Sequence, residues 1–348
     1  MAQEMMRAAV LSGPRRIELK DVPVPPVTPG TLKIRVSTCG VCGSDIHMWQ
    51  AGRGWSPTPL EDFHMGHEFC GVVVDSGDTD FRIGERVTFW ANLYCGKCDM
   101  CRSGQEHLCR EVNGARYTGF VCNGGYAEYF VGRAMNAYRL PDGVSDVAAA
   151  LIDPLMVAYH AVRRSGLRLH DRVLVGSGII AQLIGGLAKR AGASLLAMSR
   201  IDDRQLARAR EIGDFDLYFD GTAPDRAQLM REASHGGFDV VFEAVGSADA
   251  LSTCLDGVRP GGEVVPIGNS VTPTIPFSLN SVVLHELRLT GSVSCTRREF
   301  AEAIDLIDSG LINPERYVTA VLPLDHLQAA FEAQVSPKGN VLKTVVQP

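Results

Sequence analysis

Short runs in which apolar and polar residues alternate fill most of the first 150 residues, and clusters of Pro and Gly separate these runs. The runs cover residues 6–13, 17–25, 32–40, 68–77, 85–92 and 126–132. Because side chains of a strand point alternately to its two faces, a period of two is typical of half-buried strands. The pattern therefore predicts a compact β-rich domain over residues 1–150.

The pattern changes from about residue 148, where apolar runs of strand length alternate with helical segments. Strands are expected at 172–178, 194–199, 238–246, 262–268 and 288–293, and helices at 179–192 and 202–213. This alternation predicts an α/β fold, a doubly wound parallel sheet of Rossmann type, over residues 151–293. The remaining segment, 294–348, is expected to hold helices at 297–308 and 324–334 and a last strand at 340–346.

The composition restricts the class of partner. The chain has 348 residues, 34 Lys and Arg against 40 Asp and Glu, and a formal net charge of −6. This length favours two domains or three, and the absence of a run of basic residues argues against nucleic acid or an anionic membrane surface as the partner. No apolar stretch approaches the roughly 20 residues that span a bilayer, and no signal-peptide pattern is present. We therefore expect a soluble cytoplasmic protein with a small-molecule substrate.

Four of the ten cysteines lie close together, at Cys95, Cys98, Cys101 and Cys109. Four thiolates on a tight loop match the closed tetrahedral coordination of a structural zinc ion. The alternative, disulfide bonding or chance clustering, is disfavoured by the spacing and by a reducing cytosol. This motif predicts a zinc ion but does not by itself indicate an enzyme.

A looser group combines Cys42, the pair His67 and Glu68, and Asp153. Cys42, His67 and a carboxylate would offer sulfur, nitrogen and oxygen ligands and leave one position open, as a catalytic zinc ion requires. Each residue alone is more often structural, and Asp before Pro is a common turn signal. Their joint occurrence before a nucleotide-binding fold makes a catalytic zinc site the preferred interpretation.

A strand, a glycine turn and an apolar helix follow one another around Gly176, Gly178 and Ala181. Gly176 would permit the tight turn, Gly178 the approach of a pyrophosphate to the backbone, and Ala181 close packing of the helix. With Ile179 and Ile180 at the helix start, these residues predict a dinucleotide site.

The next strand ends at Ser199 and Arg200, where an NAD-preferring site would place Asp or Glu. A hydroxyl group beside a guanidinium suits a ribose 2′-phosphate, so NADP is favoured over NAD. In the competing interpretation the strand ends two residues later, and Asp202 or Asp203 binds the ribose.

Together these motifs resemble the zinc-dependent medium-chain dehydrogenase/reductase family, the alcohol dehydrogenase superfamily, over essentially the whole chain. The resemblance is carried by the segments 40–45, 66–68 and 124–129, the four-cysteine lobe, the Rossmann half and the terminal strand with Lys343. It implies that the β-rich domain is GroES-like, and that residues 294–348 return to it. The chain departs from the usual pattern in a shorter first Rossmann strand, in Ala181, and in Asp153 where the polyol and threonine dehydrogenase branch usually has Glu.

The resemblance also implies roles for individual residues. Cys42 and His67 would ligate the catalytic zinc ion with Asp153, and Glu68 would be a further ligand or a neighbour of the ligands. Asp45 would orient the imidazole of His67. Ser44 and His47 would carry the alcohol proton to solvent. The regions that line the family's substrate site contain Trp49, Trp55, Trp90, Arg116 and Cys295, although core packing is an equally simple role for the tryptophans.

The resemblance implies reversible oxidation of a secondary alcohol (a polyol, sugar or aminocyclitol) to a ketone, here with NADP. It also implies a homodimer or homotetramer that pairs through 289–293. Alternatives are an NADPH-dependent reductase of aldehydes or ketones and an NAD-dependent polyol dehydrogenase. A non-catalytic dinucleotide-binding protein or a zinc-free quinone reductase is disfavoured because Cys42, Ser44 and His67 are all present.

Overall fold

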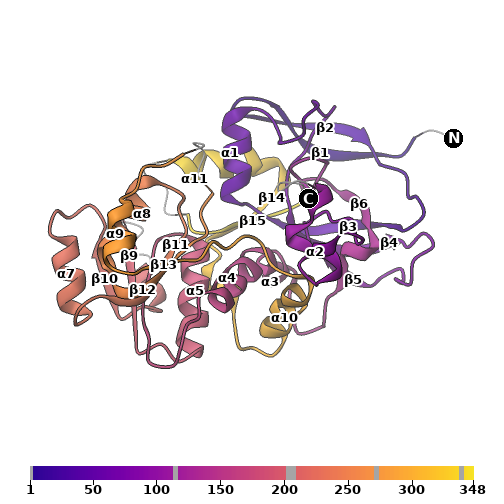
Figure 1. The fold of residues 1–348 in the computed structure, drawn as a ribbon. Helices are drawn as coiled ribbons and strands as arrows, with labels where there is room; N and C mark the ends of the chain where they lie inside the picture. The colour runs from indigo at the N-terminus through magenta and orange to yellow at the C-terminus, as the bar shows by residue number, and fades with distance from the viewer. Residues whose placement is uncertain (1–2, 113–116, 201–208, 270–273, 337–340) are drawn as a thin grey trace. The chain divides into compact units, whose positions relative to one another are not determined.

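The computed structural model describes residues 3–112, 117–200, 209–269, 274–336 and 341–348 (Figure 1). The chain divides into two compact units, one formed by Met1–Asp153 with Thr296–Pro348 and the other by Pro154–Cys295. The sequence pattern placed these changes after residues 150 and 293. We call the two parts the first unit and the second unit and describe each separately.

The first unit is built on a seven-stranded sheet in the order β14-β15-β3-β4-β5-β7, with β6 also paired to β3, and on the two-stranded sheet β1-β2. The strands are β1 (Met5–Gly13), β2 (Arg16–Pro23), β3 (Thr31–Gly40), β4 (Glu68–Asp75), β5 (Arg86–Phe89), β6 (Tyr129–Arg133), β7 (Ala137–Arg139), β14 (Ala320–Pro323) and β15 (Thr344–Gln347). The helices are α1 (Gly43–Ala51), α2 (Asp99–Arg102), α3 (Asp146–Ala149), α10 (Arg297–Asp308) and α11 (Leu327–Val335), and α4 (Ile152–Arg164) begins here. Each of the six strand segments expected before residue 150 overlaps one of these strands.

The C-terminal strand β15 lies beside β3, although the two are far apart in sequence. They pair antiparallel, with Val345 opposite Gly40 and Val346 opposite Cys39. The expected strand over 340–346 therefore begins later, at Thr344. This pairing places Lys343 next to the end of β3. Cys42 and helix α1 follow β3 in the chain.

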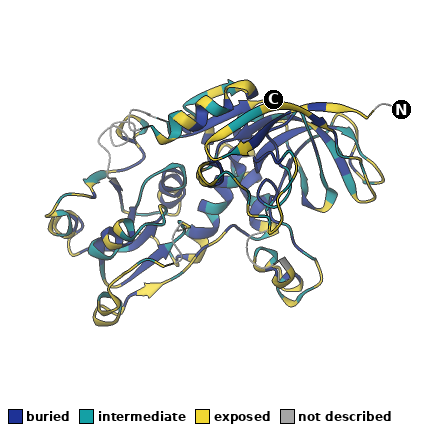
Figure 2. Cartoon of the chain, turned by 90° about the horizontal axis from the view of Figure 1, so that it is seen from above, coloured by how far each residue is buried: buried dark blue, intermediate teal, exposed yellow. Residues whose placement is uncertain are grey.

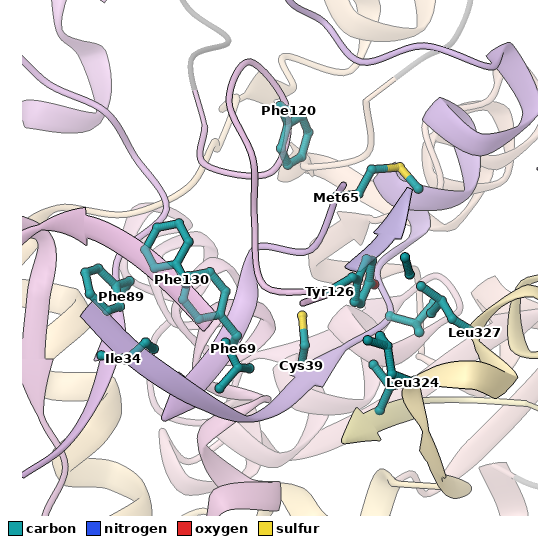
Figure 3. Close-up of a cluster of buried hydrophobic side chains, with 14 of the residues drawn as sticks. Ile34, Cys39, Met65, Phe69, Phe89, Phe120, Tyr126, Phe130, Leu324 and Leu327 are labelled. Carbon is teal, nitrogen blue, oxygen red and sulfur yellow. The ribbon is translucent and has the colours of Figure 1, made fainter. Parts of the chain in front are cut away.

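The core of the first unit is rich in aromatic side chains (Figure 3). Phe69 lies 4.6 Å from Phe130 and 5.6 Å from Phe89 between ring centroids, and Trp49 packs edge-on against Phe331 of α11 at 5.8 Å. Such rings bury large apolar areas and add geometric preference to their packing. The core therefore holds α1, β4 and α11 together around the residues of the candidate site.

The second unit contains a six-stranded sheet in the order β10-β9-β8-β11-β12-β13, and every recorded pairing in it is parallel. Its strands are β8 (Arg172–Val175), β9 (Leu195–Arg200), β10 (Leu217–Asp220), β11 (Phe238–Glu243), β12 (Val258–Pro266) and β13 (Arg288–Leu289), and its helices after α4 are α5 (Ile179–Arg190), α7 (Arg226–Ala233), α8 (Ala248–Gly257) and α9 (Leu279–Leu284). The strand order reverses between β8 and β11, which is where a doubly wound sheet binds its ligand. The predicted Rossmann-type α/β fold is confirmed.

Buried residues, dark blue in Figure 2, concentrate on inner strands such as β4, β8 and β11, whereas β2, β10 and β13 are mostly intermediate or exposed. The strand expected at 288–293 is shorter, since only Arg288 and Leu289 pair with β12. The helix expected at 202–213 falls largely on residues 201–208, which lie outside the described residues. Among the helices that the structure describes, none combines the length and apolar character needed to cross a membrane.

Candidate metal and dinucleotide sites

The four cysteines of the lobe around α2 point at one another. Their sulfur atoms are separated by 3.9 Å for Cys95–Cys101, 3.5 Å for Cys98–Cys101 and 3.8 Å for Cys98–Cys109. Four sulfurs at the zinc–thiolate distance of about 2.3 Å, arranged as a tetrahedron, would be about 3.8 Å apart. The donor set and its spacing therefore fit a zinc ion.

Backbone amides favour the thiolate form in this lobe. The amides of Lys97 and Cys98 donate to Sγ of Cys95 at 3.4 and 3.3 Å. Amide donors from Cys101 and Arg110 lower the pKa of Cys98 to about 6. Because a thiolate is the form that binds metal, these donors favour ligation by Cys95 and Cys98, whereas burial raises the pKa of Cys101 to about 12.

The second group of candidate ligands forms where β3, α1 and β4 meet. Ligand atoms of Cys42, His67 and Glu68 all lie within 4.8 Å of one another. Cys42 is the residue immediately before α1, and Glu68 is the first residue of β4. The N-terminus of a helix favours negative charge, so a thiolate is well placed at this position.

Asp45 lies beside the imidazole of His67. Its Oδ1 is 3.3 Å from Nδ1 of His67, at ion-pair distance, and neither atom has a recorded hydrogen-bond partner among the described residues. Oδ2 of Asp45 accepts from the Tyr126 hydroxyl at 2.7 Å and from the Cys42 amide at 3.1 Å. Burial lowers the pKa of His67, but the charges of Asp45 and Cys42 outweigh burial and raise it well above its usual value. This arrangement leaves Nε2 of His67 as the nitrogen available to a metal.

Lys343 binds Glu68 in the interior of the first unit. Its ammonium group pairs with the Glu68 carboxylate and donates to the carbonyl of Val41 at 2.9 Å, and both side chains are at most 2% exposed. Gly40 makes room for this pair, because a Cβ atom there would lie 2.2 Å from a carboxylate oxygen of Glu68 and 2.9 Å from the carbonyl oxygen of Ala150. The negative charge of Glu68 is thus balanced by the residue that immediately precedes the last strand.

Asp153 lies in the first turn of α4 and is not one of the three residues that converge within 4.8 Å. Burial raises the pKa of its carboxyl to about 7, while His67 lowers it and Glu68 raises it. These interactions place Asp153 in the same charged region as the three converging residues.

Ser44 and His47 lie one turn apart on α1. Oγ of Ser44 is buried and has no hydrogen-bond partner among the described residues, whereas His47 is exposed. Residues three apart on a helix are neighbours on its surface. A hydroxyl group next to the candidate metal site is therefore followed by an imidazole that reaches solvent.

The residues suggested as substrate-site neighbours separate into different environments. Trp49 and Trp90 are 2% and 0% exposed, which agrees with core packing as their role, and Cys295 is 0% exposed. Trp55 is 41% exposed. Arg116 lies outside the described residues.

A second candidate site lies at the carboxyl ends of β8, β9 and β11. Residues that line this cavity include Gly176, Ser177, Ser199, Gly221 and Glu243. Gly178 directly precedes α5 with φ of +99°, and a Cβ atom there would meet nothing within 4 Å, so the backbone is open to a ligand. Ile179 and Ile180 begin α5, and Ala181 is fully buried. The free amides of such a helix start are suited to pyrophosphate.

Of the residues suggested for the ribose contact, Ser199 lines the cavity and is 8% exposed. The backbone of Arg200 ends β9, but its side chain lies outside the described residues, as do Asp202 and Asp203.

Three functional contributors were not foreseen from the sequence. Glu243 accepts from the amides of Val245 and Gly246 at 2.7 and 2.8 Å and so holds the loop after β11. Tyr126 supports Asp45, and Lys343 balances Glu68. An acid at the carboxyl end of a buried strand was a usable signal for Glu243, whereas the other two depend on tertiary contacts.

Comparison with known proteins gives consistent matches. Residues 28–142 match the family model described as the alcohol dehydrogenase GroES-like domain, and residues 180–309 match the one described as zinc-binding dehydrogenase. The chain is 32% identical over 332 residues to a sorbitol dehydrogenase of Halalkalibacterium halodurans, covering 93% of this chain and 94% of the other. It is 32% identical over 343 residues to an L-threonine 3-dehydrogenase of Chromobacterium violaceum, covering 95% and 97%.

Solved structures of similar proteins include further dehydrogenases, in agreement with these family matches. A putative zinc-binding dehydrogenase from Sinorhizobium meliloti 1021, bound to NADP, superposes with a TM-score of 0.87 at 29% identity over 99% of this chain and 100% of the other. The 2R,3R-butanediol dehydrogenase of Bacillus subtilis superposes with a TM-score of 0.86 at 26% identity over 99% of both chains.

Proposed function

Because the chain belongs to the zinc-type medium-chain dehydrogenase family, in its polyol and threonine dehydrogenase branch, we propose that it oxidises a secondary alcohol of the polyol, sugar or aminocyclitol class to a ketone with NADP. The observation that carries this proposal is the convergence of Cys42, His67 and Glu68 within 4.8 Å, with Asp45 behind His67. That set combines sulfur, nitrogen and oxygen donors, which suits a catalytic rather than a closed structural zinc site.

We propose Asp153 as the carboxylate ligand that acts with Cys42 and His67. Glu68 is already paired with Lys343, whereas a cation next to Asp153 would favour its ionised form. A zinc ion held there would act as a Lewis acid on the substrate hydroxyl, and the nicotinamide ring of the cofactor would accept the hydride. The Asp153→Asn variant should lose the catalytic zinc ion, while Glu68→Gln should keep it.

The chain's own residues would handle the proton. Oγ of Ser44, which is buried without a partner among the described residues, would accept a hydrogen bond from the substrate hydroxyl and pass the proton to the imidazole of the exposed His47, which would deliver it to water. Asp45 and Tyr126 hold His67 in one orientation throughout. Burial and the Asp45 charge keep the pKa of Tyr126 well above its usual value, so the phenol remains a donor.

NADP is proposed over NAD because Ser199 and Arg200 end β9, where NAD-preferring sites carry an acid. The NADP bound in the Sinorhizobium meliloti structure supports this choice. Two zinc ions per chain are proposed, one in each cysteine-containing cluster. A cytoplasmic location is also proposed, because a zinc site of four thiolates requires reduced cysteines.

A homo-oligomer is proposed because β13 is the last strand of the six-stranded sheet, and no further strand of the described residues pairs with it. Exposed apolar side chains lie on and near this edge, including Leu289, Val293 and Leu284. Edge strands with apolar neighbours are ready to pair with a second copy. Light scattering should show a dimer or tetramer, and a monomer at micromolar concentration would refute this part of the proposal.

The proposed reaction is tested with zinc-loaded protein, NADP or NAD, and a panel of polyols, cyclitols and simple secondary alcohols, followed by the absorbance of the reduced nicotinamide. Cys42→Ala and His67→Ala should abolish turnover while the four-cysteine lobe keeps its zinc ion. Retained turnover without metal at the catalytic site would refute the mechanism. If the reduced cofactor and a ketone react much faster than any alcohol with NADP, the chain works as a reductase.

A further inference from the structure

Aromatic side chains pack beside His67, one of the three converging residues of the candidate metal site. The ring of Phe120 packs against the imidazole of His67 with centroids 4.8 Å apart, and the ring of Trp55 packs against Phe120 at 4.7 Å. Tyr117 packs on the same phenyl ring at 5.3 Å. We call Trp55, Phe120 and Tyr117 the aromatic wall. It extends from a metal ligand outward to an exposed indole.

The backbone holds this wall in place. The amide of Trp55 donates to the carbonyl of Phe120 at 2.9 Å, and the amide of Phe120 donates to the carbonyl of Tyr117 at 3.0 Å. Gly54 must lack a side chain, because a Cβ atom there would lie 2.6 Å from the Phe120 carbonyl oxygen. The rings are therefore positioned before any ligand binds, which reduces the ordering that binding requires.

Trp55 differs from the other tryptophans of the chain. Trp49 and Trp90 are packed into the core, while Trp55 is 41% exposed despite being fixed at both its backbone and its ring. A rigid aromatic side chain that stays exposed beside a ligand cluster is typical of a binding surface. Its flat face offers apolar contact without a competing polar group, apart from the indole N–H at its rim.

From this geometry we infer that the aromatic wall selects six-membered cyclic polyols over open-chain polyols; the inference rests on the proposed function and names its substrate class. In a ring polyol with equatorial hydroxyls, the C–H groups gather on the ring faces, so one face can pack on Trp55 and Phe120. A closed ring also loses less rotational freedom on binding than an open chain does. The hydroxyl groups at the ring edge remain free to reach the metal site and Oγ of Ser44.

The test compares substrates that differ in ring closure. Myo-inositol and scyllo-inositol are compared with sorbitol and mannitol, which carry the same six carbons and six hydroxyls as an open chain. With zinc-loaded protein and oxidised cofactor, we expect kcat/KM for a cyclitol to exceed that for the alditols by roughly tenfold or more. Calorimetry with the reduced cofactor bound gives the dissociation constants of the same compounds without turnover.

Variants at Trp55 test whether the wall causes the preference. Trp55→Ala and Trp55→Leu should remove most of the cyclitol preference in both kcat/KM and dissociation constant, because neither residue has a flat face. Trp55→Phe should keep most of it. Ile83→Ala is the matched control, since Ile83 is an exposed apolar residue of the first unit, 72% exposed, on the turn between β4 and β5; it should leave the preference unchanged.

The outcomes separate this inference from the proposed function. A cyclitol preference that disappears in the Ala and Leu variants and survives in Trp55→Phe supports it. If the alditols react as well as the cyclitols, or if the preference survives in Trp55→Leu, the inference is wrong while the dehydrogenase function stands. If no alcohol reduces either cofactor although two zinc ions are bound, the proposed function fails and this inference fails with it.

Discussion

Removing Lys343 should destabilise the first unit strongly, because this residue balances a buried charge. Its ammonium group pairs with Glu68 and also donates to the carbonyl of Val41, and the side chains of the pair are 1% and 2% exposed. Lys343→Met keeps the apolar stem but leaves a buried carboxylate without its cation. Breaking such a pair from one side costs about 3–5 kcal/mol of the free energy of unfolding. For a unit of this size, each kcal/mol lowers the melting temperature by about 2–4 °C.

The assay is thermal unfolding of the wild type, Lys343→Met, Glu68→Gln and the double variant, in zinc-containing buffer and again with a chelator. The double variant removes both charges, so it should recover much of the loss seen in Lys343→Met alone. The coupling should appear with and without metal, since the pair is formed by protein atoms only. A loss below about 1 kcal/mol in Lys343→Met, or a double variant as unstable as this single variant, would refute the role of the pair.

Four further predictions concern the other sites. Cys101→Ser should lower the zinc content, measured by mass spectrometry, from two ions per chain to about one, and a variant that still holds two would contradict the four-thiolate site. Asp45→Asn should weaken zinc binding at the Cys42 site about 10–100-fold in chelator competition, without affecting the four-cysteine lobe. Gly178→Ala should weaken NADPH binding roughly tenfold in a fluorescence titration, because φ of +99° strains any other residue, whereas Gly291→Ala, where a Cβ atom meets nothing, should not. Burial raises the pKa of Asp239, but Arg172 and Arg259 outweigh burial and lower it. Its stabilising effect is therefore present above the unfolded pKa of about 3.9 and is lost as the pH falls towards the folded value, so Asp239→Asn should unfold with a weaker dependence on acid pH.

The fold could be predicted from the sequence because the local pattern of apolar and polar residues agrees with the tertiary structure. The alternation of strands and helices after residue 148 gave the parallel sheet, since buried parallel strands are short and apolar throughout. The short length of β13 could not be predicted. Its residues are exposed at a sheet edge, and the sequence pattern does not reveal how far the neighbouring strand β12 extends. The start of β15 at Thr344 could not be predicted either. The sequence pattern includes Lys343 in the strand, but in the structure this residue precedes the strand and its side chain forms an ion pair with Glu68.

The candidate ligands could be predicted from the sequence because metal binding restricts residue type and spacing. The proximity of the four lobe cysteines follows from their short separation in the sequence. They are Cys95, Cys98, Cys101 and Cys109. Cys42 and His67 could be named only in combination, since β3 and β4 have to pair before the two residues meet. The contacts of Tyr126 and Lys343 could not be foreseen, because they join residues 81 and 275 positions apart and carry no local signal.

The charges around His67 explain why these distant residues are needed. Asp45, Glu68, Asp153 and a Cys42 thiolate would place several negative charges in one buried region, which is costly unless each is paired or hydrogen-bonded. The protein compensates two of them itself: Tyr126 and the start of α1 donate to Asp45, and Lys343 neutralises Glu68. Among the described residues, no ion pair is recorded for Cys42 or Asp153, and burial raises the pKa of Asp153 although the charges of His67 and Lys343 lower it. A divalent ion held by Cys42, Asp153 and the neutral imidazole of His67 would complete this balance. The positions of Tyr126 and Lys343 therefore favour metal binding by Cys42, His67 and Asp153, although neither residue is itself a ligand.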